Sequence, residues 1–117
     1  MFKFEHLEVW KSAIALSDCV YVATRGFPSD ERFGLTSQLR RSAVSIAANI
    51  AEGTGRGNDG DLLRFLDIAY GSLMETVSHI TIAHRQKFLD DPTQRQLYED
   101  CERLAKMINA FKNSLRR

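Results

Sequence analysis

Apolar residues recur along the chain at helical spacing and fall into four segments. The clearest segment spans residues 35–53, where apolar side chains alternate steps of four and three: Leu35, Leu39, Ala43, Ile46 and Ile50. A second apolar strip runs beside the first: Val44, Ala47, Ala48 and Ala51. This spacing is typical of an amphipathic helix, and two adjacent strips predict a helix that is covered on more than one side.

The remaining side of this helix carries polar side chains at the same steps, a set that we name the polar row: Gln38, Ser42, Ser45, Asn49 and Glu52. Three interpretations are open, namely a solvated face, a ligand-lined groove, and a hydrogen-bonded contact between subunits. Alanines beside the row permit close approach of another helix, and polar residues in apolar interfaces fix register. We therefore favour the subunit contact.

A first helix is predicted over residues 7–25, before the breakers Gly26 and Pro28. Its apolar residues follow two lines. One line contains Leu7, Trp10, Ile14, Ser17 and Tyr21, and the other contains Val9, Ala13, Leu16, Val20 and Ala23. Ser29 caps a short turn that Gly34 weakens, so the second helix is expected to begin near Leu35.

Capping residues set the other boundaries. Gly53 is expected to close the second helix as its C-terminal cap. The third helix is predicted over residues 61–87, with Asn58 or Asp59 as its N-cap. Its apolar seam is Leu62, Leu66, Ala69, Leu73, Val77 and Ile80.

The fourth helix begins with a capping pattern at residues 91–94. Asp91 is the expected N-cap, Pro92 takes the first helical position, and Gln94 completes a capping box. The seam that follows is Leu97, Cys101, Leu104, Ile108, Phe111 and Leu115. Short connections make neighbouring helices antiparallel, so the sequence predicts an all-α, up-and-down four-helix bundle. With 117 residues, 44% of them hydrophobic, the chain is expected to form one domain over residues 1–117.

Several segments also resemble a known family. They are FEHLEVWKSAIALSDCVY, FPSDERFGLTSQLRRSAVSIAANIAEGTGR and FLDIAYGSLMET, and QLRRSAVSIAANIAEG is the most specific part. The chain is similar to four-helix-bundle proteins encoded in intervening sequences of bacterial 23S ribosomal RNA genes. The resemblance implies a ring-like homo-oligomer, a pentamer, in a family whose biochemical role is largely unassigned. Relatives of similar fold are accessory subunits of reverse transcriptases in diversity-generating retroelements, and they contact nucleic acid.

Charge adds a local signal only, because the formal net charge is +1 and binders that rely on bulk electrostatics are strongly basic. Basic residues cluster near the second helix and in the last one. The candidate nucleic-acid contacts are Arg40, Arg41, Arg56, Arg64, Lys112, Arg116 and Arg117. We favour the interpretation of these residues as a solvated helix face, on which Arg116 and Arg117 stabilise the helix C-terminus, over nucleic-acid contact. Aromatic residues predict no stacking platform, because they fall at core or seam positions: Phe4, Trp10, Tyr21, Phe65 and Phe111.

Residues 55–60 read GRGNDG, a literal G-x-G-x-x-G. A dinucleotide-binding loop follows a strand, whereas here a long helix precedes the glycines, so we reject a Rossmann site. We interpret the segment as a flexible turn. An anion site supported by Arg56 and Arg64 is the alternative.

The sequence gives little support for a catalytic site or a metal site. A di-iron bundle needs Glu-x-x-His pairs, whereas Glu75 and His79 are four residues apart. Ser42, Ser45 and Ser72 lie within helices and not on a nucleophile elbow. Cys19 and Cys101 fall at apolar helical positions, which favours two buried thiols in a reducing compartment over a disulfide. We expect no enzymatic activity, no cofactor and no metal.

The chain has no apolar run of a signal peptide or a membrane span, so we expect a cytoplasmic protein without membrane contact. The first functional hypothesis is a non-enzymatic, homo-oligomeric interaction or scaffold protein. The alternative is an accessory protein that binds structured RNA or DNA through basic patches on the assembled ring. A further protein partner is not identified by this sequence.

Overall fold

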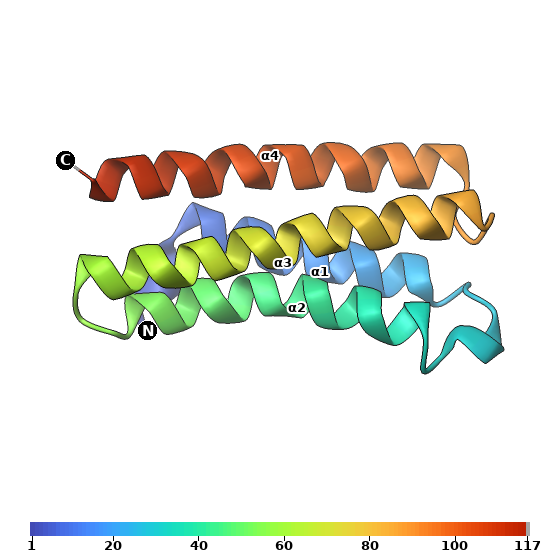
Figure 1. Ribbon diagram of the computed structural model, residues 1–117, viewed down its shortest axis with the longest axis horizontal. Helices are drawn as coiled ribbons and strands as arrows, with labels where there is room; N and C mark the ends of the chain where they lie inside the picture. The colour runs from blue at the N-terminus through green and yellow to red at the C-terminus, as the bar shows by residue number, and fades with distance from the viewer. Residues whose placement is uncertain (117) are drawn as a thin grey trace.

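The computed structural model describes residues 1–116 as four long helices and two short 3-10 helices. The 3-10 helices are η1 (Lys3–His6) and η2 (Ser29–Glu31). The long helices are α1 (Glu8–Thr24), α2 (Leu35–Thr54), α3 (Asp59–Arg85) and α4 (Asp91–Leu115). Successive helices alternate in direction along a rod of 44 × 23 × 22 Å (Figure 1). The all-α class and the four predicted helices are confirmed.

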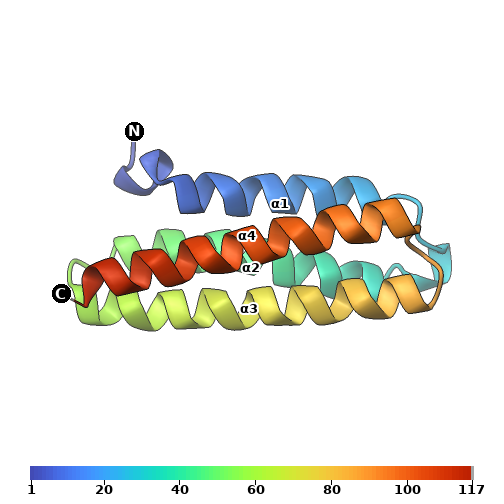
Figure 2. The ribbon, with the colours of Figure 1, turned by 90° about the horizontal axis from the view of Figure 1, so that it is seen from above.

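Each long helix packs against two neighbours, in the cyclic order α1, α2, α3, α4, and the most extensive contact joins α2 to α3. Figure 2 shows α4 running along the bundle, between α1 and α3 in this view. One continuous apolar core fills the interior. Its fully buried side chains include Leu39, Ile46, Ile50, Leu66, Leu73, Leu104 and Ile108. The seams predicted for α2, α3 and α4 supply most of this core.

One of the two apolar lines predicted on α1 enters the core. Val9, Ala13, Leu16 and Val20 are buried, whereas Ile14 and Tyr21 on the other line are exposed. The sequence pattern did not predict η1, because a four-residue 3-10 helix is too short to show periodicity. One face of α1 therefore stays outside the core.

One of the two predicted N-caps is confirmed, and the other is displaced by one residue. Asn58 is the N-cap of α3, and its Oδ1 accepts a hydrogen bond of 2.8 Å from the Asp61 amide. The N-cap of α4 is Asp90, whose Oδ1 accepts from the Thr93 amide at 2.8 Å. The prediction of Asp91 was wrong by one residue, because adjacent aspartates both fit the pattern. With Asp90 as the cap, Gln94 no longer occupies the third helical position that a capping box requires.

Gly53 does not cap α2, which continues to Thr54 and has Gly55 as its C-cap. Instead Gly53 is buried where α2 meets α3. A Cβ atom at this position would lie 2.9 Å from both Leu62 Cδ1 and Phe65 Cβ. The glycine therefore serves close helix packing. In the turn that follows, Gly57 has a φ of 84°, a conformation that favours glycine and agrees with the interpretation of GRGNDG as a turn.

Candidate interaction surfaces

The polar row is not the uncovered side of α2. Of its two serines, Ser42 is buried and Ser45 is half-buried. Both face α3, which presents Ser72, Thr76 and His79 to them. The uncovered side of α2 instead carries Arg41, Val44 and Ala48, and only the two end residues of the polar row, Gln38 and Glu52, are fully exposed. The expectation that the second apolar strip would be fully covered was wrong for Val44 and Ala48, because hydroxyl groups of α3 pair with the polar row and turn that strip outward.

The α2–α3 contact contains a group of hydrogen-bonded hydroxyls. Thr76 Oγ1 lies 2.9 Å from Ser42 Oγ and 2.9 Å from the Ser72 carbonyl oxygen. Ser45 Oγ and Ser72 Oγ are 2.9 Å apart, and Ser42 Oγ is 3.3 Å from His79 Nδ1. A buried polar group without a partner costs about 1–3 kcal/mol. These mutual bonds therefore allow hydroxyls in the α2–α3 contact at little cost.

The ends of the polar row remain accessible. Asn49 Nδ2 donates within α2 to Ser45, at 2.8 Å to its carbonyl oxygen and 3.0 Å to its Oγ. Glu52 accepts from Arg56 at 3.0 Å, and Gln38 is exposed. Hydrogen bonds inside the protomer thus occupy the Ser42 and Ser45 hydroxyls. A subunit contact stays a prediction for Gln38, Asn49 and Glu52.

The proximity of Ser42 and His79 resembles a nucleophile beside a base. Ser42 is buried, however, and its hydroxyl also lies 3.1 Å from the Leu39 carbonyl oxygen of its own helix. A nucleophile must reach a substrate. The arrangement is therefore a structural interhelical contact.

The two thiols occupy different environments. Cys101 is buried as predicted, and burial, with a smaller effect of Asp100, raises the pKa of its thiol to about 12. The prediction that Cys19 is buried was wrong, because Cys19 lies on the exposed side of α1. Partial desolvation, then Asp100 and Asp18, raise the pKa of the Cys19 thiol as well. Both thiols are held in the protonated, weakly nucleophilic form at neutral pH.

The turn that joins α2 to α3 lies at one end of the bundle, which we name the hairpin end. The predicted basic contacts near this end are paired with acidic side chains. Arg56 binds Glu52 at 3.0 Å, and Arg64 lies 3.9 Å from Asp61. Both guanidinium groups also cover the ring of Phe65, at 4.8 and 4.9 Å from its centroid. These partners neutralise much of the local positive charge.

The basic residues of α4 are also near this end. Lys112 forms an ion pair with Asp67 and lies 5.8 Å from the ring centroid of Tyr70. Arg116 is the exposed C-cap of α4. Arg117 lies outside the described residues. Of the predicted contacts, Arg56, Arg64, Lys112 and Arg116 thus lie near the hairpin end.

The connection between α1 and α2 lies at the opposite end of the bundle (Figure 1), and its residues Arg32 and Phe33 share a cleft with Arg40 and Arg41. They line a cleft of about 430 Å³, which we name the arginine groove and define by Tyr21, Arg32, Phe33, Thr36, Arg40 and Arg41. None of the ion pairs found within residues 1–116 involves its three arginines. Arg32 was absent from the predicted contacts because it lies in a connection and outside the helical pattern.

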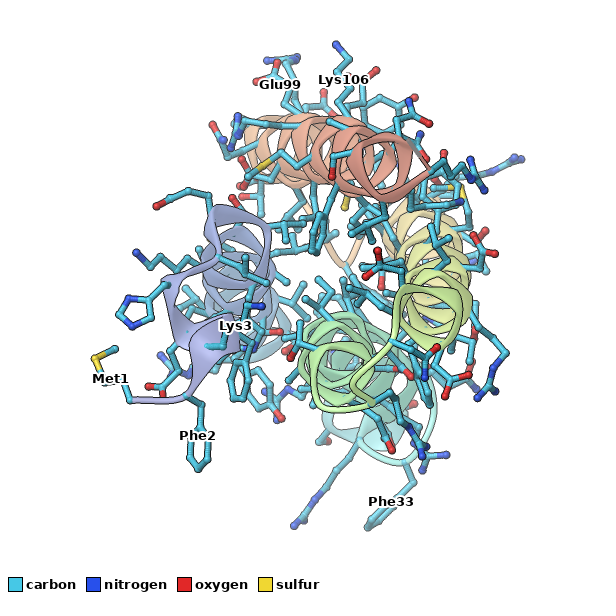
Figure 3. All side chains as sticks on the ribbon, turned by 90° about the vertical axis from the view of Figure 1, so that its left-hand side faces the viewer. Met1, Phe2, Lys3, Phe33, Glu99 and Lys106 are labelled. Atoms are coloured by element: carbon cyan, nitrogen blue, oxygen red, sulfur yellow. The ribbon has the colours of Figure 1, made fainter. Side chains whose placement is uncertain are left out.

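Two aromatic rings of the groove are exposed, so the expectation of a core or seam position was wrong for Tyr21. Phe33 is 89% exposed and Tyr21 is 39% exposed. Figure 3 shows Phe33 projecting away from the bundle. Tyr21 had been assigned to the seam of α1, and Phe33 follows the turn that precedes α2. The sequence did contain a signal for the exposure of Phe33, because this bulky aromatic residue stands between a turn and the start of a helix.

A larger, mainly apolar cleft of about 660 Å³ lies between α1 and the start of α4, lined by Val22, Phe88 and Leu97 among others. Within residues 1–116, no group of three or more His, Cys, Asp and Glu side chains is arranged to hold a metal ion. Over the same residues, no helix combines the length and hydropathy that a bilayer crossing needs.

Comparisons with known proteins agree with this architecture. Residues 5–110 match the model of the family described as 23S rRNA-intervening sequence protein. A crystal structure of a protein of unknown function from the S23 ribosomal protein family of Bacteroides thetaiotaomicron has the same fold, with a TM-score of 0.80 and 20% sequence identity. That alignment covers 89% of this chain and 97% of the other. No curated protein matches the sequence. Because the family model spans most of its length, the chain belongs to the 23S rRNA-intervening sequence protein family.

Proposed function

We propose that the protein is a non-enzymatic, homo-oligomeric interaction module that acts in the cytoplasm. The observation that carries this proposal is an exposed strip along α3 on which two isoleucines, Ile68 and Ile82, are 43% and 48% exposed and flank Glu75. A monomer would leave these side chains in water at a cost of about 25 cal/mol per Å² of apolar surface. A second copy of the chain is the occupant that we propose for this strip.

The arrangement of α3 suits contact with another helix. Ile68, Glu75 and Ile82 are spaced by seven residues and therefore lie along one line of the helix. Gly71 is exposed beside this line, and a Cβ atom there would meet nothing within 4 Å. Gln38 of α2 shares a shallow cleft with Ile82. A subunit that docks on this strip would thus also reach the accessible end of the polar row.

Light scattering after size exclusion tests the assembly. We expect a particle of five subunits, as the family resemblance implies, with five times the 13.3 kDa mass of one chain. Ile68→Glu combined with Ile82→Glu should dissociate it, because burying unpaired carboxylates is costly. Ile14→Glu on α1, at a similarly exposed apolar position, is the matched control. A wild-type monomer at micromolar concentration would contradict the proposal.

Asn49 tests the part of the polar row that remains accessible. If its amide contacts another subunit, Asn49→Leu leaves the partner unsatisfied, a loss of about 1–3 kcal/mol for each contact around the ring. The assembly should then weaken before the protomer unfolds. An unchanged mass, with nucleic-acid binding lost, would move Asn49 to a functional surface.

A second candidate function is the binding of RNA or DNA. The specific observation that favours it is the absence of carboxylate partners for Arg32, Arg40 and Arg41 within residues 1–116. Affinity should fall steeply with salt, because each neutralised phosphate releases counterions. Gel retardation of a mixed RNA and DNA panel at low salt is the test, and no retardation would contradict this function.

A further inference from the structure

The arginine groove concentrates positive charge that the protein does not neutralise. Three arginines line it together with hydroxyl and aromatic side chains, and its lining contains no carboxylate. Like charges repel one another, so such a cluster attracts anions and is stabilised when one binds. The groove is therefore suited to an anionic ligand.

One of these arginines is held in place before any ligand arrives. Arg40 Nε donates to Thr24 Oγ1 at 2.8 Å, and the buried Thr24 hydroxyl in turn donates to the Val20 carbonyl oxygen at 2.8 Å. The Arg40 guanidinium carbon also lies 4.6 Å from the ring centroid of Tyr21. A side chain ordered in advance loses less entropy when it binds. Its terminal nitrogens have no hydrogen-bond partner within residues 1–116.

The exposed ring of Phe33 also has a defined position. It lies in a turn fastened by Glu31, whose Oε1 accepts from the Leu35 amide at 3.1 Å and whose carbonyl oxygen accepts from the Gly34 amide at 3.0 Å. The Arg32 guanidinium carbon is 5.4 Å from the ring centroid of Phe33. A flat apolar ring is thus presented to solvent beside a cation.

Cations and exposed rings together favour one class of ligand. Unpaired bases stack on aromatic side chains while arginines bind the neighbouring phosphates. A base inside a duplex has both faces covered and is not available for stacking on Phe33. The groove volume of about 430 Å³ lies within the range of small-ligand sites, about 300–1,000 Å³.

We propose that the arginine groove binds an unpaired nucleotide of single-stranded RNA or DNA. The base stacks on the ring of Phe33, and the adjoining phosphates are bound by Arg32, Arg40 and Arg41. This proposal rests on the nucleic-acid function proposed above, and it adds the strand state and the residues that recognise it.

Fluorescence anisotropy with a short labelled polyuridine strand, the equivalent DNA strand and a hairpin duplex tests the proposal. Phe33→Ala should raise the Kd for the single strands by at least about fivefold, the lower limit for one base–aromatic stack, and should leave the weaker duplex binding unchanged. Phe2→Ala is the matched control, because Phe2 is also highly exposed and the N-terminus lies at the opposite end of the bundle (Figure 1). Arg41→Gln should reduce the slope of log K against log salt by about 0.7.

Four outcomes would overturn this proposal, and they have different meanings. No binding by the wild-type protein would remove both the nucleic-acid function and the groove as its site. Equal binding by wild type, Phe33→Ala and Arg41→Gln would leave the function and reject the groove. Displacement of the strand by AMP at an equal affinity would identify a free nucleotide as the ligand. A changed assembly mass for Phe33→Ala at unchanged Kd would identify a subunit contact.

Discussion

The two ends of the bundle carry arginines in different electrostatic states. At the hairpin end, Arg56 and Arg64 have the carboxylates of Glu52 and Asp61 beside them and share the ring of Phe65. In the arginine groove, Arg32 lies beside the ring of Phe33, Arg40 lies beside Tyr21 and Thr24, and the lining contains no acid. This difference in local pairing is the basis for proposing the arginine groove, and not the hairpin end, as the site that an anionic ligand contacts.

The largest expected difference concerns affinity for a single strand. Arg32→Glu with Arg41→Glu removes two phosphate contacts and adds repulsion, so we expect the Kd to rise about 100-fold at low salt. Arg56→Glu with Arg64→Glu, an equal change of net charge at the hairpin end, should have a much smaller effect. Anisotropy measurements on both double variants provide the comparison. Equal losses would mean that net charge alone governs binding.

The packing of the hairpin end can be disturbed without any change of charge. Gly53→Ala places a Cβ atom 2.9 Å from Phe65 Cβ, and the strain outweighs the better helix propensity of alanine. We expect a net loss of about 1–2 kcal/mol in the free energy of unfolding. Strand affinity should stay unchanged. Urea denaturation measures the first quantity, with Gly26→Ala as control because a Cβ there meets nothing within 4 Å. A Gly53→Ala protein whose free energy of unfolding equals that of the wild type would contradict the packing role of Gly53.

Arg40 connects stability to binding within the arginine groove. Arg40→Gln removes the hydrogen bond to Thr24 and the contact with Tyr21, so the free energy of unfolding should fall by about 1 kcal/mol. Strand affinity should fall in the same variant. Thermal melting and anisotropy on one protein sample test both effects. Loss of affinity with unchanged stability would show that Arg40 is not anchored as described.

The smallest expected effect is at the ion pair of Glu52 and Arg56. Both side chains are substantially exposed, and such pairs on a helix contribute about 0.3–0.5 kcal/mol. Glu52→Gln should therefore change stability very little, but it frees the Arg56 guanidinium. If pairing suppresses binding at the hairpin end, strand affinity should rise modestly at low salt. A decrease in affinity would contradict that role of the pair.

The fold could be predicted from the sequence because helical periodicity is local information. The seam residues of α2, α3 and α4 were identified from spacing alone, and Asn58 from capping preference. The errors also have local causes. Asp90 and Asp91 are both suitable caps, and Gly53 follows a helix pattern that fits either a cap or a close contact. Only the partner helix decides between these alternatives, and spacing within one helix does not describe its partner.

The surfaces were less predictable because they depend on contacts between distant parts of the chain. Ser42 and Thr76 are 34 residues apart, and nothing in the spacing of either helix indicates their hydrogen bond. Arg40 and Arg41 were found from their density, but the pairing that distinguishes them from Arg56 depends on the folded geometry. Phe33 lies in a short connection, where no periodic pattern indicates exposure.

Photo-crosslinking of a strand that contains 4-thiouridine, followed by mass spectrometry of the peptides, tests the central claim most directly. The method works on the assembled protein and reports which residues lie beside the base. The account predicts crosslinks at Phe33 or Tyr21 in the arginine groove, abolished by Arg32→Glu with Arg41→Glu. Crosslinks concentrated at residues 53–65, and retained in that double variant, would contradict it.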